Sequence, residues 1–495
     1  MGIAPLWPRP EGPALVRKVL EGTGYLNARV KPVEGAGLPS TGVEGGPDGP
    51  IIEEPGETDP AFDTIVRLFA IGASTNLDDF REAIAPMDPA EWHEAGFVHV
   101  DGSKVHPKVR LHPHEGLVIA FDNPPVGMEK APPDYVMPVA ASSATLARIT
   151  VPTSGSFLDV GAGCGVLALL AARTHSTAVA SDMNPRAASF ADFNVRLNEL
   201  DNVECVVGDL FEPVEGRRFH HIVSNPPFVI SPETSFIYRD AGTQSDQISE
   251  RIVRAAPKYL EEGGYYQMLV NWARVRGEDW KERLAAWFEG SGCDVWVMED
   301  DVLEVSLYAS RWIRGSEALD RQGFTDRLDQ WLAYYEKQDI EAVGFGAITL
   351  RKTAGRPGWV KFDSETNILG RFVGRDIARI FEGRGFLADL GDDDRSLLEQ
   401  KLRIHPSARL RNEAEPGEQM WDVIKMHLVM AEGTGPVGVL DPYVAQMLAR
   451  ADGTRTLREL VEGIADGVDA PYDNVVGPAL ELVKTLISEG FLTPN

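Results

Sequence analysis

The 495-residue chain has few cysteines, no long apolar run and too few basic residues to balance its acidic ones. Its three cysteines, Cys164, Cys205 and Cys293, lie far apart, so neither a disulfide framework nor a cysteine zinc site is expected, and we predict no bound metal. No stretch is apolar for long enough to cross a bilayer, and the N-terminus lacks the charged start and apolar centre of a secretory signal. The sequence therefore predicts a cytoplasmic protein with no membrane partner.

The deficit of basic residues bears on nucleic-acid binding. The 48 Lys and Arg residues stand against 75 Asp and Glu, which gives a formal charge of −27. This charge opposes contact with a phosphate backbone, so a nucleic-acid substrate would need a local basic surface. The best candidate is an arginine-rich stretch at 371–411, but acidic residues within it largely offset its charge. A solvated helix face is the favoured interpretation of this stretch.

The composition is that of an ordinary globular protein, with 43% hydrophobic and 25% charged residues, and the length suggests about three domains. Gly and Pro in 1–58 predict an arm or linker, and amphipathic and alternating patterns in 59–138 predict a small accessory α+β domain. We assign 139–355 to a catalytic domain, 356–438 to a connecting helical segment and 439–495 to a C-terminal module.

The central segment alternates β-rich runs with helical stretches, as expected for a parallel sheet covered by helices on both faces. The predicted fold class is α/β, a doubly wound Rossmann-like sheet flanked by the small domains. Helices are predicted at 166–173, 186–200 and 247–259. Seven strands are predicted, at 156–160, 177–181, 203–207, 220–224, 264–270, 294–298 and 342–350.

A glycine-rich loop follows the first of these strands. Asp159 and Val160 lead into Gly161-Ala162-Gly163-Cys164-Gly165, and helix-forming apolar residues come next. Glycines let a backbone approach a ligand closely, and exposed amides at a helix start favour a carboxylate. A dinucleotide-binding loop requires G-x-G-x-x-G, but Val166 stands at the third glycine position. The spacing acid-x-G-x-G-x-G is instead typical of methyltransferases.

Carboxylates follow the next two strands, where a nucleoside could bind. Asp182 ends the second strand, and two ribose hydroxyls could donate to its oxygens. Asp209 follows the third strand and could accept from an adenine amine while Leu210 packs on the ring. Either aspartate alone is equally well explained as a helix cap. The loop and the two aspartates in this order favour a cofactor site.

The fourth strand leads into the tetrad Asn225-Pro226-Pro227-Phe228. An amide or exocyclic amine nitrogen is a poor nucleophile because its lone pair is delocalised, so the protein must orient it. The Asn225 side-chain oxygen and the Pro226 carbonyl oxygen can each accept an N–H, the prolines stiffen the loop, and Phe228 can stack on a planar group. These four residues are the catalytic candidates, and positioning rather than a strong general base would lower the barrier.

Together, the loop and the tetrad resemble the amino-methyltransferase group of the class I S-adenosylmethionine-dependent methyltransferases. This group includes adenine methylases and release-factor glutamine methyltransferases, and its N-P-P-F/Y motif matches residues 225–228 position by position. The resemblance implies N-methylation, S-adenosylmethionine as cofactor, and a seven-stranded sheet whose last strand runs antiparallel. The cofactor-binding candidates are Asp159, Gly161, Ala162, Gly163, Gly165, Asp182, Met183, Asp209, Leu210 and Asn225.

Two further pairs of residues are candidates for the substrate pocket. Tyr238 and Arg239 follow the tetrad, and Asn271 and Trp272 follow the fifth strand, so both pairs should lie on the carboxyl rim of the sheet. Arg239 could bind an anion or carboxylate. A purely structural loop role is equally compatible with these residues.

The C-terminal module carries the run 452–460, a helical stretch at 475–489 and a short strand at 490–492. It resembles a small winged-helix module, similar to the peptide-binding chaperone family of the pyrroloquinoline quinone pathway. Because it has no catalytic cluster of its own, we expect it to capture a macromolecular substrate; covering an apolar face of the catalytic domain is the alternative.

Three functions stay open at this point. The first is methylation of a planar amide or amine nitrogen in a protein or peptide, favoured by the acidic charge and the possible peptide-binding module. The second is methylation of an exocyclic base nitrogen in RNA or DNA, in which a flipped base would stack on Phe228. The third is a non-catalytic cofactor-binding scaffold, which the intact tetrad disfavours.

Overall fold

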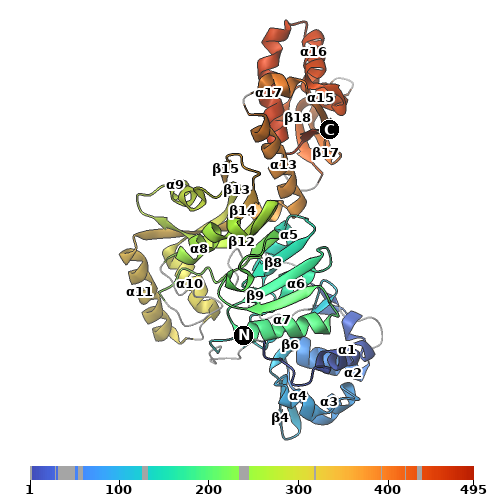
Figure 1. The fold of residues 1–495 in the computed structure, drawn as a ribbon, viewed down its shortest axis with the longest axis vertical. Coiled ribbons are helices and arrows are strands. Elements are labelled where there is room, and N and C mark those ends of the chain that lie inside the picture. The colour runs from blue at the N-terminus through green and yellow to red at the C-terminus, as the bar shows by residue number, and fades with distance from the viewer. Residues whose placement is uncertain are drawn as a thin grey trace. The chain divides into compact units, whose positions relative to one another are not determined.

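The computed structural model describes residues 3–27, 29–31, 51–53, 59–124, 132–232, 245–316, 319–391, 393–417, 420–431 and 438–494 (Figure 1). The chain forms two compact units. Unit 1 comprises Met1–Ala147, Thr153–Ala354 and Val360–Asn367, and unit 2 comprises Arg148–Pro152, Gly355–Trp359 and Ile368–Asn495. The predicted accessory and catalytic domains therefore lie almost entirely within one unit.

An eight-stranded sheet forms the centre of unit 1, with the strand order β10-β9-β8-β11-β12-β14-β13-β15. Strand β14 pairs antiparallel with both β12 and β13, as expected for the last strand of a methyltransferase sheet. The strands are β8 (Ser156–Val160), β9 (Thr177–Asp182), β10 (Val203–Val207), β11 (Phe219–Ser224), β12 (Leu260–Val275), β13 (Cys293–Glu304), β14 (Ile340–Lys352) and β15 (Val360–Ser364). All seven predicted strands are confirmed. The eighth, β15, is a short run that the sequence did not predict and that pairs with β13.

Helices cover the two faces of this sheet (Figure 1). The first group is α5 (Ala141–Ile149), α6 (Val166–Ala171) and α7 (Pro185–Leu197), and the second is α8 (Gln247–Ala255) and α9 (Trp280–Ala285). Side chains of α8 and α9, such as Ile252 and Leu284, share one buried cluster with Leu158 and Ile222 of the strands. The three predicted central helices are thus confirmed, with α8 followed by a short 3-10 turn at Ala256–Tyr259.

A pair of helices, α10 (Val305–Ser316) and α11 (Arg321–Lys337), is inserted between β13 and β14. It packs on Ala273 and Val343. Trp272, the neighbour of Ala273 on β12, belongs instead to the cluster under α8 and α9. Because successive side chains of a strand point to opposite faces, the inserted pair covers the other face of the sheet.

The N-terminal segment differs from the predicted arm. Helix α1 (Gly12–Gly22) has Pro13 in its first turn and buries Val16, Val19 and Leu20 at helical spacing. Arg17 donates to the Leu197 carbonyl oxygen at the end of α7, at 3.0 Å. The prediction of an extended arm is therefore wrong for this part of 1–58. The Gly- and Pro-rich run that motivated it falls mainly at 32–50 and 54–58, outside the described residues.

The accessory region has the predicted helices and strands. They are α2 (Pro60–Ile65), η2 (Val66–Ile71), α3 (Leu77–Ala83), α4 (Pro89–Glu94), β3 (Thr75–Asn76), β4 (Val98–Asp101), β5 (Lys104–Pro107), β6 (Val109–His114) and β7 (Leu117–Asp122). Two amide side chains bond the backbone of β7: Asn194 of α7 bonds Ala120 at 2.7 and 3.0 Å, and Asn198, the residue that caps the end of α7, bonds Val118 at 2.9 and 2.8 Å. These bonds join the accessory region to α7, one of the helices on the central sheet.

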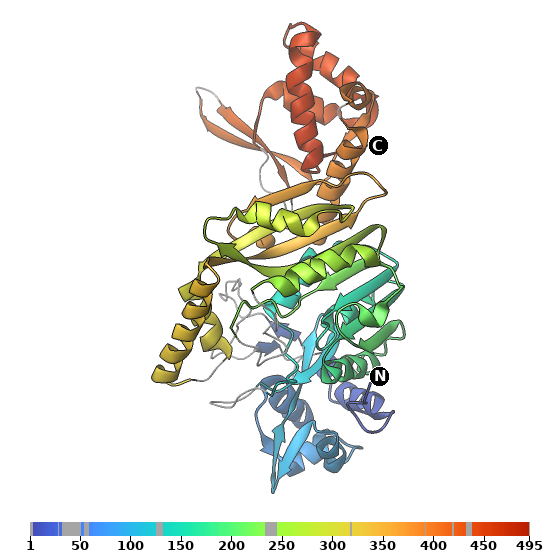
Figure 2. The same cartoon turned by 60° about the vertical axis from the view of Figure 1, so that its left-hand side comes forward.

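Unit 2 contains two three-stranded sheets, β20-β16-β21 and β17-β18-β19. Figure 2 shows the orange β17–β18 hairpin projecting from the helices of its own unit. Its helices are α12 (Ile368–Arg371), α13 (Gly374–Leu390), α14 (Asp394–Leu398), α15 (Pro442–Arg450), α16 (Leu457–Gly467) and α17 (Tyr472–Ser488). Its strands are β16 (Lys401–Ile404), β17 (Ala408–Pro416), β18 (Trp421–Met430), β19 (Val439–Leu440), β20 (Asp452–Thr456) and β21 (Leu492–Pro494).

The predicted boundary at 439 cuts through this unit. Strands at 401–404 and 421–430, within the segment predicted to be helical, pair with strands beyond 439, and one buried cluster extends from Leu397 to Leu492. The prediction of a connecting helical segment at 356–438 is therefore wrong for these strands, although α12, α13 and α14 in the same range are helical. The winged-helix likeness of 439–495 stays a prediction.

Arg379, from the arginine-rich stretch, is buried and pairs with Asp376 at 3.0 Å, so it adds nothing to a basic surface. The three cysteines are free thiols. In the ranges given above, no helix is long and apolar enough to cross a membrane, and no three His, Cys, Asp or Glu side chains are grouped to hold a metal ion.

Candidate active site

The two central motifs meet at the carboxyl end of the sheet. Strand β8 lies between β9 and β11: the chain adds β9 and β10 on one side of β8 and then continues with β11 on its other side, and open α/β sheets bind ligands outside such a switch point. The glycine loop follows β8 and the tetrad follows β11. A Cβ atom added at Gly161 would lie 3.9 Å from the Cα atom of Pro226. The loop and the tetrad are therefore in direct proximity.

The glycines of the loop serve two different needs. Gly161, Gly163 and Gly165 have φ angles of 76°, 56° and 84°, which residues other than glycine rarely adopt. A Cβ atom at Gly165 would meet Ala191 at 3.0 Å, so this glycine allows close helix packing. Beside Gly163 a Cβ atom would have no neighbour within 4 Å. The backbone at Gly163 therefore borders open space.

Most amides of the loop already have acceptors. The amides of Gly161 and Ala162 donate to the Ser181 carbonyl oxygen at 2.8 and 3.0 Å, and the Gly165 amide donates to the Ala162 carbonyl oxygen at 2.8 Å. The Gly163 amide donates to the Asp182 carboxylate at 2.8 Å. The expectation that exposed amides of this loop would receive a ligand carboxylate is not met at these four positions.

Asp182 lies at the end of β9, beside the loop. One of its oxygens accepts from the Gly163 amide and the other accepts from the Asn184 amide, each at 2.8 Å. Burial raises the pKa of Asp182, and these two backbone hydrogen bonds oppose that shift. Each oxygen keeps a second lone pair for another donor.

Asp159, at the other side of the loop, has a different environment. It is 1% exposed, and neither carboxylate oxygen has a hydrogen-bond partner of ordinary geometry. Burial, together with the nearby charge of Asp182, raises the pKa of Asp159 to about 8, and a contact with the Ala168 backbone only partly offsets this. Asp159 is therefore held largely in its neutral form at neutral pH.

The remaining cofactor candidates flank the same end of the sheet. Met183 is 56% exposed, which is unusual for a large apolar side chain beside a buried strand. Leu210 has a φ of 48° and packs against the main core, and its carbonyl oxygen accepts from the Ser181 hydroxyl at 3.4 Å. Asp209 forms an ion pair with Arg251 of α8 at 2.5 Å, so one of its oxygens already has a partner.

In the tetrad, the two ends of the Asn225 side-chain amide differ. Its Nδ2 atom donates to the hydroxyls of Ser142 and Ser143 on α5, at 3.0 and 3.4 Å. Its Oδ1 atom is buried and has no partner. The Phe228 ring lies 6.3 Å from that of Phe345 on β14 and packs against the cluster formed by α10 and α11.

Two tyrosine side chains hold the segment just after the tetrad, and Asn271 contacts one of them. The Ile230 amide donates to the Tyr308 hydroxyl at 3.1 Å, and the Tyr335 hydroxyl donates to the Ile230 carbonyl oxygen at 2.8 Å. Asn271, which is 2% exposed, donates to the Tyr308 hydroxyl at 2.7 Å. Both tyrosines belong to the inserted helices, which therefore fix the exit of the tetrad.

The four candidates for the substrate pocket differ in where the structure places them. Asn271 lies on the same face of β12 as the inserted helices and contacts Tyr308. Trp272 points to the other face, is fully buried and stacks on Trp280 with ring centroids 5.6 Å apart. Trp272 thus has a core role, whereas Tyr238 and Arg239 lie outside the described residues.

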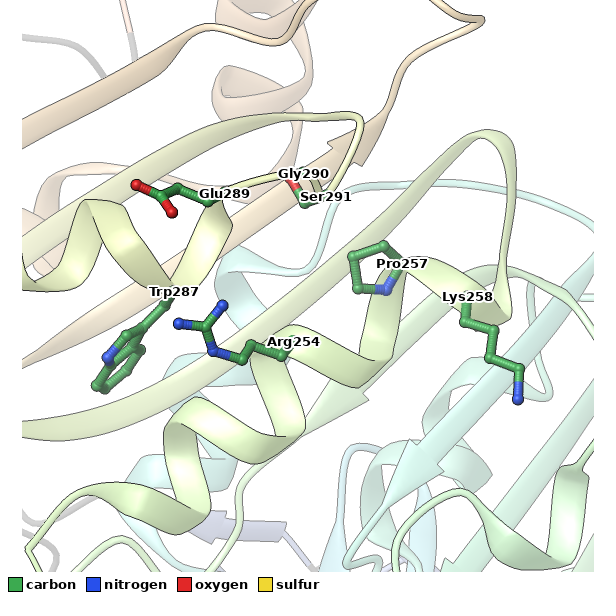
Figure 3. Close-up of a pocket in the computed structure, with 7 residues that line it drawn as sticks. All are labelled: Arg254, Pro257, Lys258, Trp287, Glu289, Gly290 and Ser291. Atoms are coloured by element: carbon green, nitrogen blue, oxygen red, sulfur yellow. The ribbon is translucent and has the colours of Figure 1, made fainter.

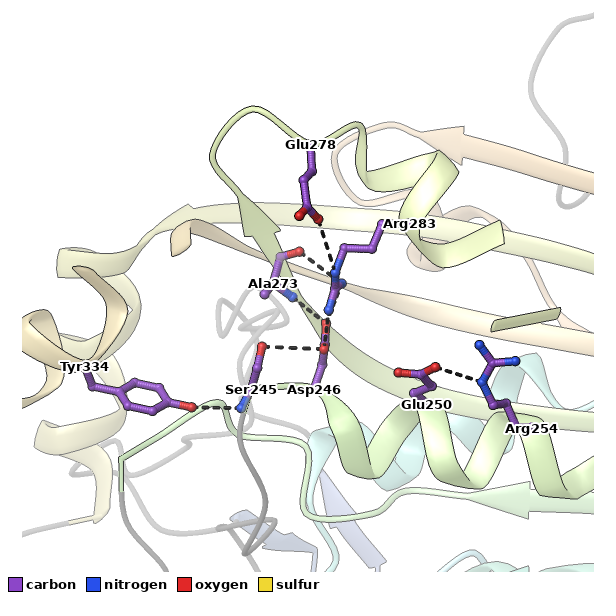
Figure 4. Close-up of polar contacts among 8 residues, drawn as sticks. All are labelled: Ser245, Asp246, Glu250, Arg254, Ala273, Glu278, Arg283 and Tyr334. Carbon is purple, nitrogen blue, oxygen red and sulfur yellow. Dashed lines mark hydrogen bonds and ion pairs between the residues drawn. The ribbon is translucent and has the colours of Figure 1, made fainter. Parts of the chain in front are cut away.

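An ion pair fixes the start of α8, where the described chain resumes after the tetrad (Figure 4). Asp246 is 2% exposed, pairs with Arg283 at 2.5 Å and accepts from the Ala273 amide at 2.9 Å. Ser245 donates its amide to the Tyr334 hydroxyl at 2.8 Å. This arrangement ties α8 to β12, α9 and α11.

A separate hollow lies at the opposite edge of the sheet (Figure 3). Its lining comes from the end of α8 and the turns before β12 and β13, including Arg254, Lys258 and Trp287. Arg254 pairs with Glu250 and Lys258 with Glu215, both at 2.7 Å. None of the predicted site residues lines this hollow, which belongs to the amino edge and not to the rim that carries the two motifs.

The sequence did not single out Ser142, Ser143, Tyr308, Tyr335 or Arg251. Ser142 and Ser143 stand 83 and 82 residues before Asn225, and two serines at the start of a helix indicate at most a cap. The tyrosines occur in helices whose spacing indicates core packing. No local pattern could have assigned these residues to the site.

Comparisons with known proteins identify two regions of the chain. Residues 139–288 match the family described as methyltransferase small domain, and residues 378–494 match a domain of unknown function, DUF7782. The first match covers both motifs and ends before β13. The second lies within unit 2 and begins well before the predicted boundary at 439.

Three curated relatives illustrate the first match. The chain is 28% identical over 163 residues to the release factor glutamine methyltransferase of Geobacter sulfurreducens, covering 30% of this chain and 55% of that protein. It is 34% identical over 130 residues to the enzyme of the same name from Aquifex aeolicus, covering 23% and 45%. It is 32% identical over 133 residues to ribosomal RNA small subunit methyltransferase C of Cronobacter sakazakii, covering 26% and 35%. The chain thus spans about half or less of each of these relatives.

Proposed function

We propose that the protein is an S-adenosylmethionine-dependent methyltransferase of the amino-methyltransferase group that methylates a planar amide or amine nitrogen of a protein or peptide, because residues 139–288 match the methyltransferase small domain family and release factor glutamine methyltransferases. The formal charge of −27 favours this substrate class over a polyanion. The two release-factor relatives are named for a glutamine side chain, which is such an amide.

The residues around the glycine loop fit the cofactor. S-adenosylmethionine supplies the electrophilic methyl group when bound. The free lone pairs of Asp182 suit two ribose hydroxyls, and the open space beside Gly163 admits a ligand against the backbone. Met183 and Leu210 offer apolar surface to an adenine ring, and Asp209 has one oxygen left for its amine.

The observation that carries the proposal is the unpartnered Oδ1 atom of Asn225. A buried acceptor without a donor costs about 1–3 kcal/mol of folding stability. A ligand N–H that bonded the Oδ1 atom of Asn225 would remove this cost. Asn225 and the Pro226 carbonyl oxygen would accept the two N–H groups of an acceptor amide while Phe228 stacks on its plane. The lone pair of the nitrogen is then aimed at the methyl group, and positioning lowers the barrier.

We expect Asn225→Ala to lose turnover by about a hundredfold while keeping S-adenosylmethionine affinity, because only the acceptor aimed at the reacting nitrogen is removed. Single-turnover methyl transfer and calorimetric binding measure the two effects separately. Asn202→Ala is the control, since it deletes an amide that bonds the Ala172 and His175 carbonyl oxygens away from the tetrad. Wild-type turnover in Asn225→Ala would refute the positioning mechanism.

The substrate class is tested by transfer of labelled methyl groups to a cell extract separated into protein, RNA, DNA and small-molecule fractions. Label in the protein fraction, removed by protease and located on a side-chain amide or amine by mass spectrometry, supports the proposal. Label confined to another fraction overturns it.

A second candidate is methylation of an exocyclic nitrogen of a base in RNA. It is favoured by the relative from Cronobacter sakazakii, which is named for ribosomal RNA. An RNA shift assay across salt concentrations separates the candidates, because phosphate contacts impose a steep decrease of affinity with salt.

Unit 2 completes the proposal as the part that captures a macromolecular substrate. Its β17–β18 hairpin exposes an apolar group, in which Met420 is 73%, Trp421 67%, Ile424 53% and Val423 51% exposed. Large apolar groups in contact with water are uncommon on a chain with no partner. Binding there would add affinity without touching the reacting atoms.

A further inference from the structure

Two serine hydroxyls contact the side-chain amide of Asn225. Ser142 and Ser143 occupy the first turn of α5, and their oxygens lie 3.0 and 3.4 Å from Nδ2. An amide nitrogen carries two N–H groups, so the two hydroxyls provide one acceptor for each. All of the donors of the side chain are thus satisfied by α5, while its single acceptor, Oδ1, has no partner.

A side-chain amide can take two orientations that exchange its oxygen and nitrogen while leaving its shape nearly unchanged. In the opposite orientation the hydroxyls would face the oxygen, and two buried N–H groups would be unpaired instead of one acceptor. Unpaired buried N–H groups are rarer in proteins than carbonyl oxygens with unused lone pairs. The serine pair therefore selects one orientation of Asn225.

We propose, resting on the function above, that Ser142 and Ser143 are positioning residues that keep the Asn225 oxygen directed at the acceptor nitrogen. Without them the amide can turn, and its N–H groups would then face the N–H groups of the acceptor. Two donors cannot bond each other, so a turned amide neither binds nor orients the nitrogen. The serines act only through Asn225 and touch neither the methyl donor nor the acceptor.

The test is the double substitution Ser142→Ala and Ser143→Ala in the full-length protein. We expect the rate of transfer from labelled S-adenosylmethionine to the accepting extract fraction to fall about tenfold, with an unchanged dissociation constant for S-adenosylmethionine. Ser142→Thr, which keeps the hydroxyl, should retain the rate. Thr145→Ala is the matched control, since it removes a hydroxyl from the same helix and no hydrogen bond joins Thr145 to Asn225.

A second comparison separates positioning from a general effect on the fold. In an Asn225→Ala background the serine substitutions should cause no further loss, because the group that they orient is absent. An additive loss there, or a double serine variant with the wild-type rate, would overturn the proposal. If Asn225→Ala itself keeps the wild-type rate, the proposed function fails first, and this outcome is distinct from a failure of the serines alone.

A measurement without substrate covers the case in which the double variant does not fold. In protein labelled with ¹⁵N at asparagine, the Asn225 side-chain signal is assigned by its loss in Asn225→Ala. Hydrogen exchange of its two Nδ2 protons should be slow in the wild type, because both are bonded to hydroxyls. Exchange as fast as that of an exposed asparagine in the wild type would contradict the arrangement directly.

Discussion

Two carboxylates at the ends of neighbouring strands show how environment separates residues of the same type. Asp182 has a backbone donor on each oxygen, whereas Asp159 is buried with none of ordinary geometry. Desolvation without compensating hydrogen bonds favours the neutral acid. We therefore propose a ligand-accepting role for Asp182 and none for the buried, neutral Asp159.

We expect Asp182→Ala to weaken S-adenosylmethionine binding by roughly tenfold or more, because it removes acceptors for ribose hydroxyls worth on the order of 1–3 kcal/mol. Isothermal calorimetry measures the change. Asp192→Ala is a suitable control, since that carboxylate pairs with Arg196 on α7 at 3.0 Å and away from the loop. Equal affinity in Asp182→Ala and the control would remove Asp182 from the cofactor site.

The raised pKa of Asp159, at about 8, predicts a pH dependence of stability in the absence of ligand. The folded state keeps a proton that the unfolded chain releases above about pH 4, so stability falls as pH rises through the window from about 4 to 8. Asp159→Asn removes this contribution. Melting temperatures measured from pH 5 to 8 should therefore decrease more steeply for the wild type than for the variant, and parallel curves would show that Asp159 is ionised in the fold.

At the scale of elements, the helices α10 and α11 hold the chain that follows the tetrad. They enter between β13 and β14, cover the face that carries Asn271, and hold the backbone of Ile230 through Tyr308 and Tyr335. Their packing also surrounds Phe228. Helices that follow the tetrad by about 80 residues or more thus hold the residues next to it.

We expect Tyr308→Phe to reduce turnover by about tenfold with little change in S-adenosylmethionine affinity, because the buried Ile230 amide and Asn271 both lose their acceptor. Steady-state kinetics and calorimetry report the two quantities. Tyr259→Phe is the matched change at the amino edge of the sheet, where the hydroxyl bonds Glu215 at 2.5 Å. If both variants behave alike, the contacts of Tyr308 do not position the tetrad.

At the scale of the whole molecule, the chemistry and the proposed capture of substrate fall in different units. All described residues of the two motifs lie in unit 1, while the exposed apolar hairpin lies in unit 2. A cut near residue 435 would divide the second unit, because its buried cluster combines residues from both sides of that point. Surface substitutions in the intact chain are the better probe.

We expect Trp421→Ala to raise the Michaelis constant for a macromolecular acceptor several-fold while leaving maximal turnover unchanged, because binding there is equal in the ground and transition states. The side chain is 67% exposed, so the melting temperature should hardly move. Val468→Ala, at an exposed position after α16, serves as the control. An unchanged Michaelis constant would exclude the hairpin from substrate capture.

Local patterns determined most of the central fold. Strand alternation and helical spacing placed all seven predicted strands, because short runs of residues carry these preferences. The spacing of Gly161, Gly163 and Gly165 predicted the loop, and the carboxyl-end rule placed the loop and tetrad at one rim. Local patterns did not predict where unit 2 begins, because strands such as β16 are stabilised by partner strands about 50 or more residues away in the chain.

The sequence by itself determined which residues are the candidates for chemistry, since Asn225, Asp182 and the glycines stand at the ends of strands at recognisable spacing. Only the tertiary structure decided how these residues are held. The hydroxyls of Ser142 and Ser143 reach Asn225, Arg251 reaches Asp209, and Tyr308 reaches Ile230, each across 42 or more residues of chain. Such pairs have no local signature, because the packing of whole elements, rather than the preferences of neighbouring residues, brings the atoms together.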